Sequence, residues 1–132
     1  MSLILDASVL AEILVGSRRG RVAEPLLLGH DIHVLELTSV EVVSVFRGWV
    51  RAGMVSSTRA AQAIEDLAIF PTHTWPHRPL PPDIWELRDN FSPYDASCVA
   101  LAQALGFPLL TGDARLAKAM ETSGVGSVIL VS

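Results

Sequence analysis

Short apolar runs alternate with longer segments of helical period along this chain. The run Ser2–Leu5 is too short for a helix and predicts a strand, and glycines follow several of the helical segments. Strands are predicted at residues 2–5, 32–37, 71–75, 107–110 and 127–131. Helices are predicted at residues 9–15, 19–28, 38–52, 57–69, 83–89, 94–105 and 113–120. Strands that alternate with helices predict a three-layer α/β/α sandwich with a mostly parallel central sheet.

Length and composition narrow the class of protein. With 132 residues, we expect one domain, residues 1–132, that buries a core of its own. Half of the residues are hydrophobic and 18% are charged, which excludes a disordered chain. No apolar stretch approaches the ~18 residues of a membrane span, and the first run, with Asp6 and Glu12, is unlike a signal peptide. Because Cys98 is the only cysteine, no internal disulfide forms, and we expect a cytoplasmic protein.

The charge balance neither favours nor excludes a nucleic-acid partner. The net charge of −4 argues mildly against one, because a basic footprint is usual. However, nine of the ten basic residues are arginine, whose planar fork suits phosphate and base stacking better than lysine does. Clusters occur at Arg18, Arg19 and Arg21, and at Arg47 and Arg51.

Four carboxylates stand where an apolar run gives way to the start of a helix. They are Asp6, Glu41, Asp95 and Asp113, in the segments LILDAS, LTSVEVVSVFR, SPYDASCVALA and LLTGDARLAKA. Each acid alone has an explanation in helix capping. Asp6 and Asp113 are suited to the N-cap, while Glu41 and Asp95 follow Thr38 and Ser92 by three residues, as in a capping box.

Taken together, the four acids predict a metal site. In an open parallel α/β sheet, ligands bind beyond the carboxyl ends of the strands, and the predicted elements place the acids near that edge. Four anions gathered there without a counter-charge repel each other by roughly several kcal/mol in a partly dry site. A hard divalent cation such as Mg²⁺, which prefers oxygen ligands, relieves that repulsion.

An all-carboxylate metal site suits the hydrolysis of phosphodiesters. A metal ion turns water into a nucleophile near neutral pH, and a second ion can stabilise the leaving oxygen. A carboxylate that is not fully committed to the metal can orient or deprotonate that water. Glu41 is best suited to this role because its side chain reaches further.

Other residues offer weaker sites. His73 and His77 are separated by a proline that interrupts any helix, and His30 and His33 flank a predicted turn, so neither pair is expected to bind zinc. Cys98 is expected to be buried in a helix without an activating base. The three tryptophans are predicted to be core or interface residues.

At the acidic residues the chain resembles the PIN-domain family, specifically the VapC-type toxins of prokaryotic toxin–antitoxin pairs. The first strand and aspartate of that family are matched by LILDASVL, and its glutamate helix by EVVSVFR. Its long C-terminal block, with the third and fourth acids, is matched by WELRDNFSPYDASCVALAQALGFPLLTGDARLAKA. The resemblance covers nearly the whole chain. It departs at Cys98, where the block more often has tyrosine, and we expect this to alter packing rather than chemistry.

The resemblance implies an α/β/α fold and a Mg²⁺- or Mn²⁺-dependent endoribonuclease. It also implies a VapB-like antitoxin as partner and a toxin homodimer. By position, the family's metal-binding acidic quartet corresponds to Asp6, Glu41, Asp95 and Asp113. Ser8 and Thr111 match small hydroxyl residues that orient the first and last acids. Two alternatives stay open: a PIN nuclease that processes RNA without an antitoxin, and a non-catalytic α/β interaction module whose acids only cap helices.

Overall fold

A five-stranded parallel sheet forms the middle layer of the computed structural model, which describes residues 1–132. The strand order is β3-β2-β1-β4-β5, so β1 lies at the centre. The strands are β1 (Ser2–Leu5), β2 (Asp31–Leu35), β3 (His73–Trp75), β4 (Leu109–Thr111) and β5 (Val128–Leu130). Every predicted strand is therefore present, with ends shifted by at most about two residues, as is usual for such boundaries.

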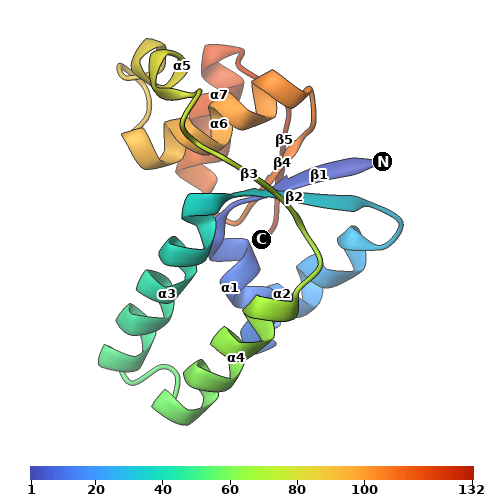
Figure 1. The fold of residues 1–132 in the computed structure, drawn as a ribbon, viewed down its shortest axis with the longest axis vertical. Helices are drawn as coiled ribbons and strands as arrows, with labels where there is room; N and C mark the ends of the chain where they lie inside the picture. Colours follow the sequence, from blue (N-terminus) through green and yellow to red (C-terminus); the bar gives the residue numbers. More distant parts are fainter.

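Helices cover both faces of this sheet (Figure 1). One face carries α1 to α4, and the other carries α5, α6 and α7. The helices are α1 (Ala7–Val15), α2 (Arg18–Ala23), the 3₁₀ helix η1 (Glu24–Leu27), α3 (Glu36–Arg51), α4 (Ser57–Ile69), α5 (Pro81–Glu86), α6 (Pro93–Leu105) and α7 (Ala114–Ser123). The predicted three-layer α/β/α sandwich is confirmed. No helix combines the length and apolar composition that crossing a bilayer requires.

The central strand β1 divides the core into two halves. Leu3 and Leu5 pack on the side of α1 to α4, whereas Ile4 packs on the side of α5 to α7. This alternation follows from the two-residue period of a strand. Because both faces are covered, β1 is apolar at every buried position, as strands of parallel sheets usually are. Asp6 is the first polar residue after the strand, at its carboxyl end.

One predicted helix is divided in two. The pattern predicts a single helix over residues 19–28, but the chain forms α2 and then η1. Pro25 is the cause, because its nitrogen carries no hydrogen to donate to the carbonyl of Arg21 and its ring crowds that carbonyl. The prediction of a continuous helix was wrong, although the proline that breaks it is plain in the sequence.

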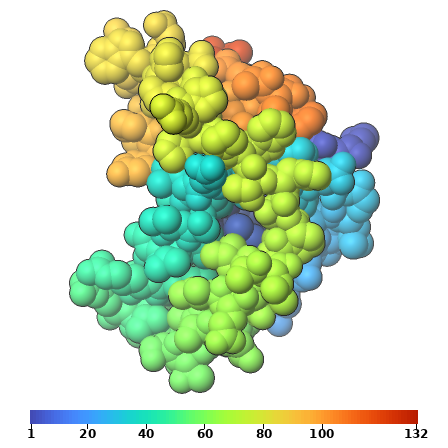
Figure 2. Space-filling model, viewed as in Figure 1, coloured from blue at the N-terminus to red at the C-terminus, as the bar shows by residue number.

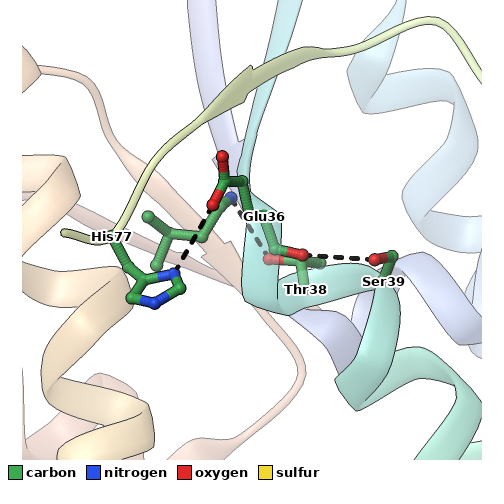
Figure 3. Close-up of polar contacts among 5 residues, drawn as sticks. Glu36, Thr38, Ser39 and His77 are labelled. Atoms are coloured by element: carbon green, nitrogen blue, oxygen red, sulfur yellow. Dashed lines mark hydrogen bonds and ion pairs between the residues drawn. The ribbon is translucent and has the colours of Figure 1, made fainter.

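The start of α3 also differs from the prediction. Thr38 is expected at the N-cap, but α3 begins at Glu36 and Thr38 occupies its third position. The Thr38 hydroxyl accepts a hydrogen bond from the backbone N–H of Leu35 at 3.2 Å (Figure 3). Glu41 is therefore a residue of the second helical turn. The capping role expected for Glu41 is wrong, and its side chain is left for another use.

Two further contacts hold the start of α3 in place (Figure 3). The Ser39 hydroxyl donates a hydrogen bond to the carbonyl of Glu36 at 3.2 Å. The Glu36 carboxylate also lies 3.8 Å from Nδ1 of His77, which connects this helix end to the segment after β3. The two side chains of this pair are more than half exposed, so the pair contributes little to stability.

A hollow opens on the face seen in Figure 2, between α3 and the segment that joins α4 to β3. It has a volume of about 480 Å³, with Leu10 and Val34 among its lining residues. None of the four predicted acids lines it.

Helices α1 and α2 approach each other so closely that one position requires glycine. A Cβ atom at Gly20, in α2, would lie 2.0 Å from the backbone oxygen of Glu12, in α1. The backbone N–H of Gly20 is also held by the Ser17 hydroxyl at 3.0 Å. The atom that a side chain would meet is backbone, so neither helix can yield by changing a rotamer.

We predict that Gly20→Ala lowers the free energy of unfolding by roughly 1–3 kcal/mol, because α1 and α2 must separate to admit the methyl group. Gly48→Ala is the matched control. No atom lies within 4 Å of a Cβ placed at Gly48, in α3, so the change should stabilise the helix by about 0.5–1 kcal/mol. Urea unfolding monitored by circular dichroism measures both. Loss of stability by a similar amount in the two variants would contradict the close approach.

Candidate active site

One cleft brings together all four predicted acids. Its volume is about 560 Å³, and it lies beyond the carboxyl ends of the central strands. Its lining residues are Asp6, Ala7, Ser8, Leu37, Val40, Glu41, Ser44, Val45, Tyr94, Asp95, Cys98, Asp113 and Leu116. The acids come from four separate segments: the end of β1, the middle of α3, the start of α6 and the loop after β4. Parallel topology produces this convergence, as the sequence predicted.

Asp6 is the most buried of the four acids, with only 8% of its surface exposed. It is the N-cap of α1, as predicted, and its Oδ1 accepts hydrogen bonds from the backbone N–H of Val9 at 2.9 Å and from the Ser8 hydroxyl at 3.0 Å. Its Oδ2 accepts one from the Thr111 hydroxyl. Burial nevertheless raises the pKa of Asp6, because these donors offset only part of the cost of removing the carboxylate from water.

Thr111 joins the first and last acids. Its hydroxyl donates to Asp6 and accepts a hydrogen bond from the backbone N–H of Asp113 at 3.0 Å. The contact exists because β1 and β4 are neighbours, with the backbone N–H of Asp6 bonded to the carbonyl of Leu110 at 3.3 Å. Thr111 is fully buried, so its donor and acceptor roles are fixed by the sheet.

Asp113 begins α7, as predicted. Its Oδ1 accepts hydrogen bonds from the backbone N–H groups of Arg115 at 2.9 Å and Leu116 at 3.2 Å. Capping uses one of its two oxygens. The other oxygen makes no hydrogen bond within the chain and is available at the cleft. Asp113 can therefore cap a helix with one oxygen and bind a ligand with the other at the same time.

Glu41 occupies the cleft from the side of α3. Burial, together with the negative charges of Asp6 and Asp95, raises its pKa to about 7. It makes no ion pair with an arginine or lysine, since the only ion pair in the chain joins Glu36 and His77. A carboxylate with this pKa can take up a proton near neutral pH, which its ordinary value would not allow.

Asp95 is the third residue of α6, as predicted. The Ser92 hydroxyl caps that helix by accepting a hydrogen bond from the backbone N–H of Asp95 at 3.2 Å. Burial and the negative charge of Asp113 raise the pKa of Asp95, and the charge of Arg115 lowers it. The pKa values of Asp6, Glu41 and Asp95 are thus all raised, chiefly by burial and further by the negative charges of neighbouring acids.

Cys98 belongs to the inner wall of the cleft. It lies one turn after Asp95 on α6 and is almost fully buried, as expected from the sequence. Burial, reinforced by the charges of three of the acids, raises the pKa of its thiol. The thiol therefore stays protonated and packs as a small apolar group rather than acting as a nucleophile.

The donor set fits a hard divalent cation. Carboxylate oxygens are the ligands that Mg²⁺ and Mn²⁺ prefer, and the raised pKa values mark a place where positive charge is favourable. As arranged, no three His, Cys, Asp or Glu side chains are close enough to hold one ion between them. Mg²⁺ commonly binds through one or two carboxylates and keeps its other ligands as water, so this spacing is compatible with the ion.

His33 lies in a strand, as the predicted strand at residues 32–37 implies. It lies in β2 and is buried, and its Nδ1 accepts a hydrogen bond from Nε1 of Trp75 at 3.0 Å. Its ring stacks on that of His73, with centroids 4.7 Å apart. Burial and the neighbouring His73 lower the pKa of His33, which keeps the ring neutral and able to accept. Neither His33 nor His73 lines the acidic cleft, so these histidines support the sheet edge.

Two residues of the cleft region were not predicted from the sequence to belong to the site. Tyr94 lines the cleft directly before Asp95, and Arg115 lies close enough to lower the pKa of that aspartate. Only their positions in the sequence could have indicated this, because each residue lies within two places of a predicted acid. Hydrophobic patterning gives no such signal, since both side chains are exposed.

Comparison with known proteins identifies the family to which this chain belongs. The PIN domain family matches residues 3–121, nearly the whole chain. Ribonuclease VapC12 of Mycobacterium tuberculosis is 30% identical over 116 residues, which cover 88% of this chain and 90% of the relative. Ribonuclease VapC1 of the same species is 36% identical over 118 residues, with 88% and 89% covered. This chain belongs to the PIN-domain family, and VapC ribonucleases are among its relatives.

A solved structure supports the same fold. The VapBC2 complex of Rickettsia felis, bound to a DNA fragment from its promoter, contains a chain that matches this one with a TM-score of 0.67. The match covers all of both chains at 12% identity. At that identity the likeness establishes the shared fold, and it agrees with the parallel α/β/α arrangement described above.

We predict that Glu41→Gln removes a destabilising effect that grows with pH. Between about pH 4.5 and 7 the folded wild type keeps a proton on Glu41 that the unfolded chain has lost, so wild-type stability falls as pH rises through this window. Because Glu41 is half-exposed, we expect a reduced effect: the free energy of unfolding of the variant, relative to that of wild type, should rise by about 1–2 kcal/mol from pH 4 to pH 8.

Urea unfolding in a buffer with chelator, at both pH values, measures this gain. Glu65→Gln, the same change at an exposed position of α4, is the matched control and should leave the pH dependence as it is. A difference between wild type and Glu41→Gln that is equal at pH 4 and pH 8 would rule out the raised pKa.

Proposed function

We propose that this chain is a metal-dependent endoribonuclease that acts as the toxin of a type II toxin–antitoxin pair. The observation that carries the proposal is the convergence of four carboxylates from four segments on one cleft, in a chain related to VapC ribonucleases. Such a donor set has no histidine or thiolate ligand and suits hard cations and phosphate chemistry. The proposed site consists of Asp6, Glu41, Asp95 and Asp113, with Ser8 and Thr111 as positioning residues.

Hydrolysis requires that a water oxygen bonds to phosphorus while the bond to the leaving oxygen breaks. Asp6 and Asp95, with Asp113 beside them, would hold Mg²⁺ or Mn²⁺, and the bound ion would supply positive charge for the phosphate and lower the pKa of water. Glu41, which lines the cleft from the side of α3, would accept the proton that the attacking water gives up, because its side chain reaches further than that of an aspartate. Thr111 and Ser8 hold the Asp6 carboxylate in one orientation through their hydroxyl groups.

The partners that we propose follow from the proposed role as the toxin of a toxin–antitoxin pair. A VapB-like antitoxin would bind the toxin in a hetero-oligomer, which the likeness to a chain of the Rickettsia felis VapBC2 complex supports. The toxin itself would form a homodimer, as the resemblance to VapC-type toxins implies. A PIN nuclease that processes RNA without an antitoxin would have the same acidic cleft. A short open reading frame directly upstream of the coding sequence separates these two cases.

We predict that the wild-type protein cleaves single-stranded RNA in Mg²⁺ or Mn²⁺, and that Asp6→Asn and Asp95→Asn each lower the rate by roughly 100-fold or more. Each change removes a negative charge that holds the cation, while the side chain keeps its size. Gel analysis of end-labelled RNA, with and without chelator, measures cleavage.

Asp66→Asn is the matched control, because it makes the same substitution at an exposed position of α4, away from the cleft. It should cleave like wild type. Circular dichroism of every variant excludes loss of fold as the cause of lost activity. Equal cleavage by wild type, Asp6→Asn and Asp95→Asn would reject the proposed site, and absence of cleavage by wild type would reject the proposed activity.

A further inference from the structure

A second cavity adjoins the acidic cleft. It has a volume of about 280 Å³, and Asp95, Asp113 and Leu116 line both spaces. Its lining residues are Asn90, Phe91, Ser92, Asp95, Asp113, Arg115, Leu116 and Ala119. Because the two cavities share Asp95, Asp113 and Leu116, they are adjacent, and we call them together the groove. A chain-like ligand can therefore extend both ways from a phosphate held at the acids.

The side of the groove toward α3 presents an exposed aromatic ring. Tyr94 is 61% exposed although it lines the cleft, and Val40, on the same cleft, is 65% exposed. No other aromatic ring or cation of the chain packs on Tyr94. The backbone is nevertheless fixed, because the carbonyl of Tyr94 accepts a hydrogen bond from the Ser97 hydroxyl at 2.6 Å. A firmly held helix end thus carries a free aromatic face at the mouth of the cleft.

The side of the groove toward α7 presents a cation. Arg115 is exposed, lines the second cavity and is near enough to Asp95 to lower the pKa of that aspartate. It makes no ion pair within the chain. Asn90 and Ser92, which add polar groups, line the same cavity. This half of the groove is suited to a phosphate, whereas the half with Tyr94 is suited to a base.

We propose that the groove binds a single strand of RNA across the acids, with one nucleobase stacked on Tyr94 and a neighbouring phosphate bound by Arg115. The inference rests on the proposed nuclease function and adds how the substrate is held. A base must be free of its own helix to stack on a protein ring, so the groove selects single-stranded or looped RNA over duplex. Aromatic stacking tolerates any base, whereas a cation contacts only the backbone.

Binding can be measured apart from cleavage in the Asp95→Asn background, in buffer with Mg²⁺. The probes are a fluorescein-labelled single-stranded RNA of about ten nucleotides and an abasic strand of the same length. In that background Tyr94→Ala should weaken binding of the RNA by roughly five- to a hundredfold and leave binding of the abasic strand unchanged. Tyr94→Phe, which keeps the ring, should bind both strands like the parent.

Arg115→Gln should weaken binding of both strands alike and lower the slope of log Kd against log salt by about 0.7, the value for one phosphate contact to a single strand. Two controls match these variants. Trp85→Ala removes an exposed aromatic ring that Arg88 already covers, and Lys118→Gln removes an exposed cation of α7. Neither residue lines the groove, so neither change should alter either Kd.

The inference is overturned if Tyr94→Ala binds RNA like the parent or weakens binding of both strands equally, or if Arg115→Gln leaves the salt slope unchanged. If wild type still cleaves RNA in these cases, the proposed function survives and only the path of the strand is wrong. If wild type neither binds nor cleaves RNA in Mg²⁺ or Mn²⁺, the proposed function fails and this inference fails with it.

Discussion

A buried carboxylate at the end of the central strand is the constraint on which the rest of the site depends. Asp6 directly follows β1, where parallel topology brings β4 alongside, and Thr111 can reach it only because those two strands pair. Three hydrogen-bond donors surround the carboxylate, yet no cation of the chain does. The fold thus buries a carboxylate where the loss of hydration disfavours its charged form, and neutral hydrogen-bond donors offset part of that cost.

The other three acids lower the stability of the folded chain further and, for the same reason, make the cleft more favourable for a cation. Glu41, Asp95 and Asp113 add negative charge around the same cleft, and burial together with the charges of neighbouring acids raises the pKa values of Glu41 and Asp95. Sites that bind ions commonly give up stability in this way, because a bound cation recovers it. The capping bonds of Asp6 and Asp113 are compatible with that role, since capping leaves carboxylate oxygen available.

The sequence predicted the strands and two of the helix N-caps well because apolar runs and helix caps are local signals. Asp6 and Asp113 are N-caps as expected, and all five strands are present. The predictions that failed concern where helices begin and break, and Pro25, which divides the helix predicted at residues 19–28, is itself a local signal. The apolar Leu35 is the N-cap of α3, so Thr38 was wrongly placed there. His33 lies in a strand as predicted, but its contacts with His73 and Trp75 of β3 arise from strand pairing, which local patterning does not indicate.

Titration calorimetry with Mn²⁺ measures whether the cleft binds a divalent cation through its carboxylates. We expect saturable binding to wild type in the range of micromolar to millimolar Mn²⁺, weakened by at least about tenfold in Asp95→Asn. We also expect weaker binding at pH 5 than at pH 8, because protonated carboxyl groups compete with the ion. No binding heat at millimolar Mn²⁺, or equal binding by wild type and Asp95→Asn, would contradict a carboxylate metal site in this cleft.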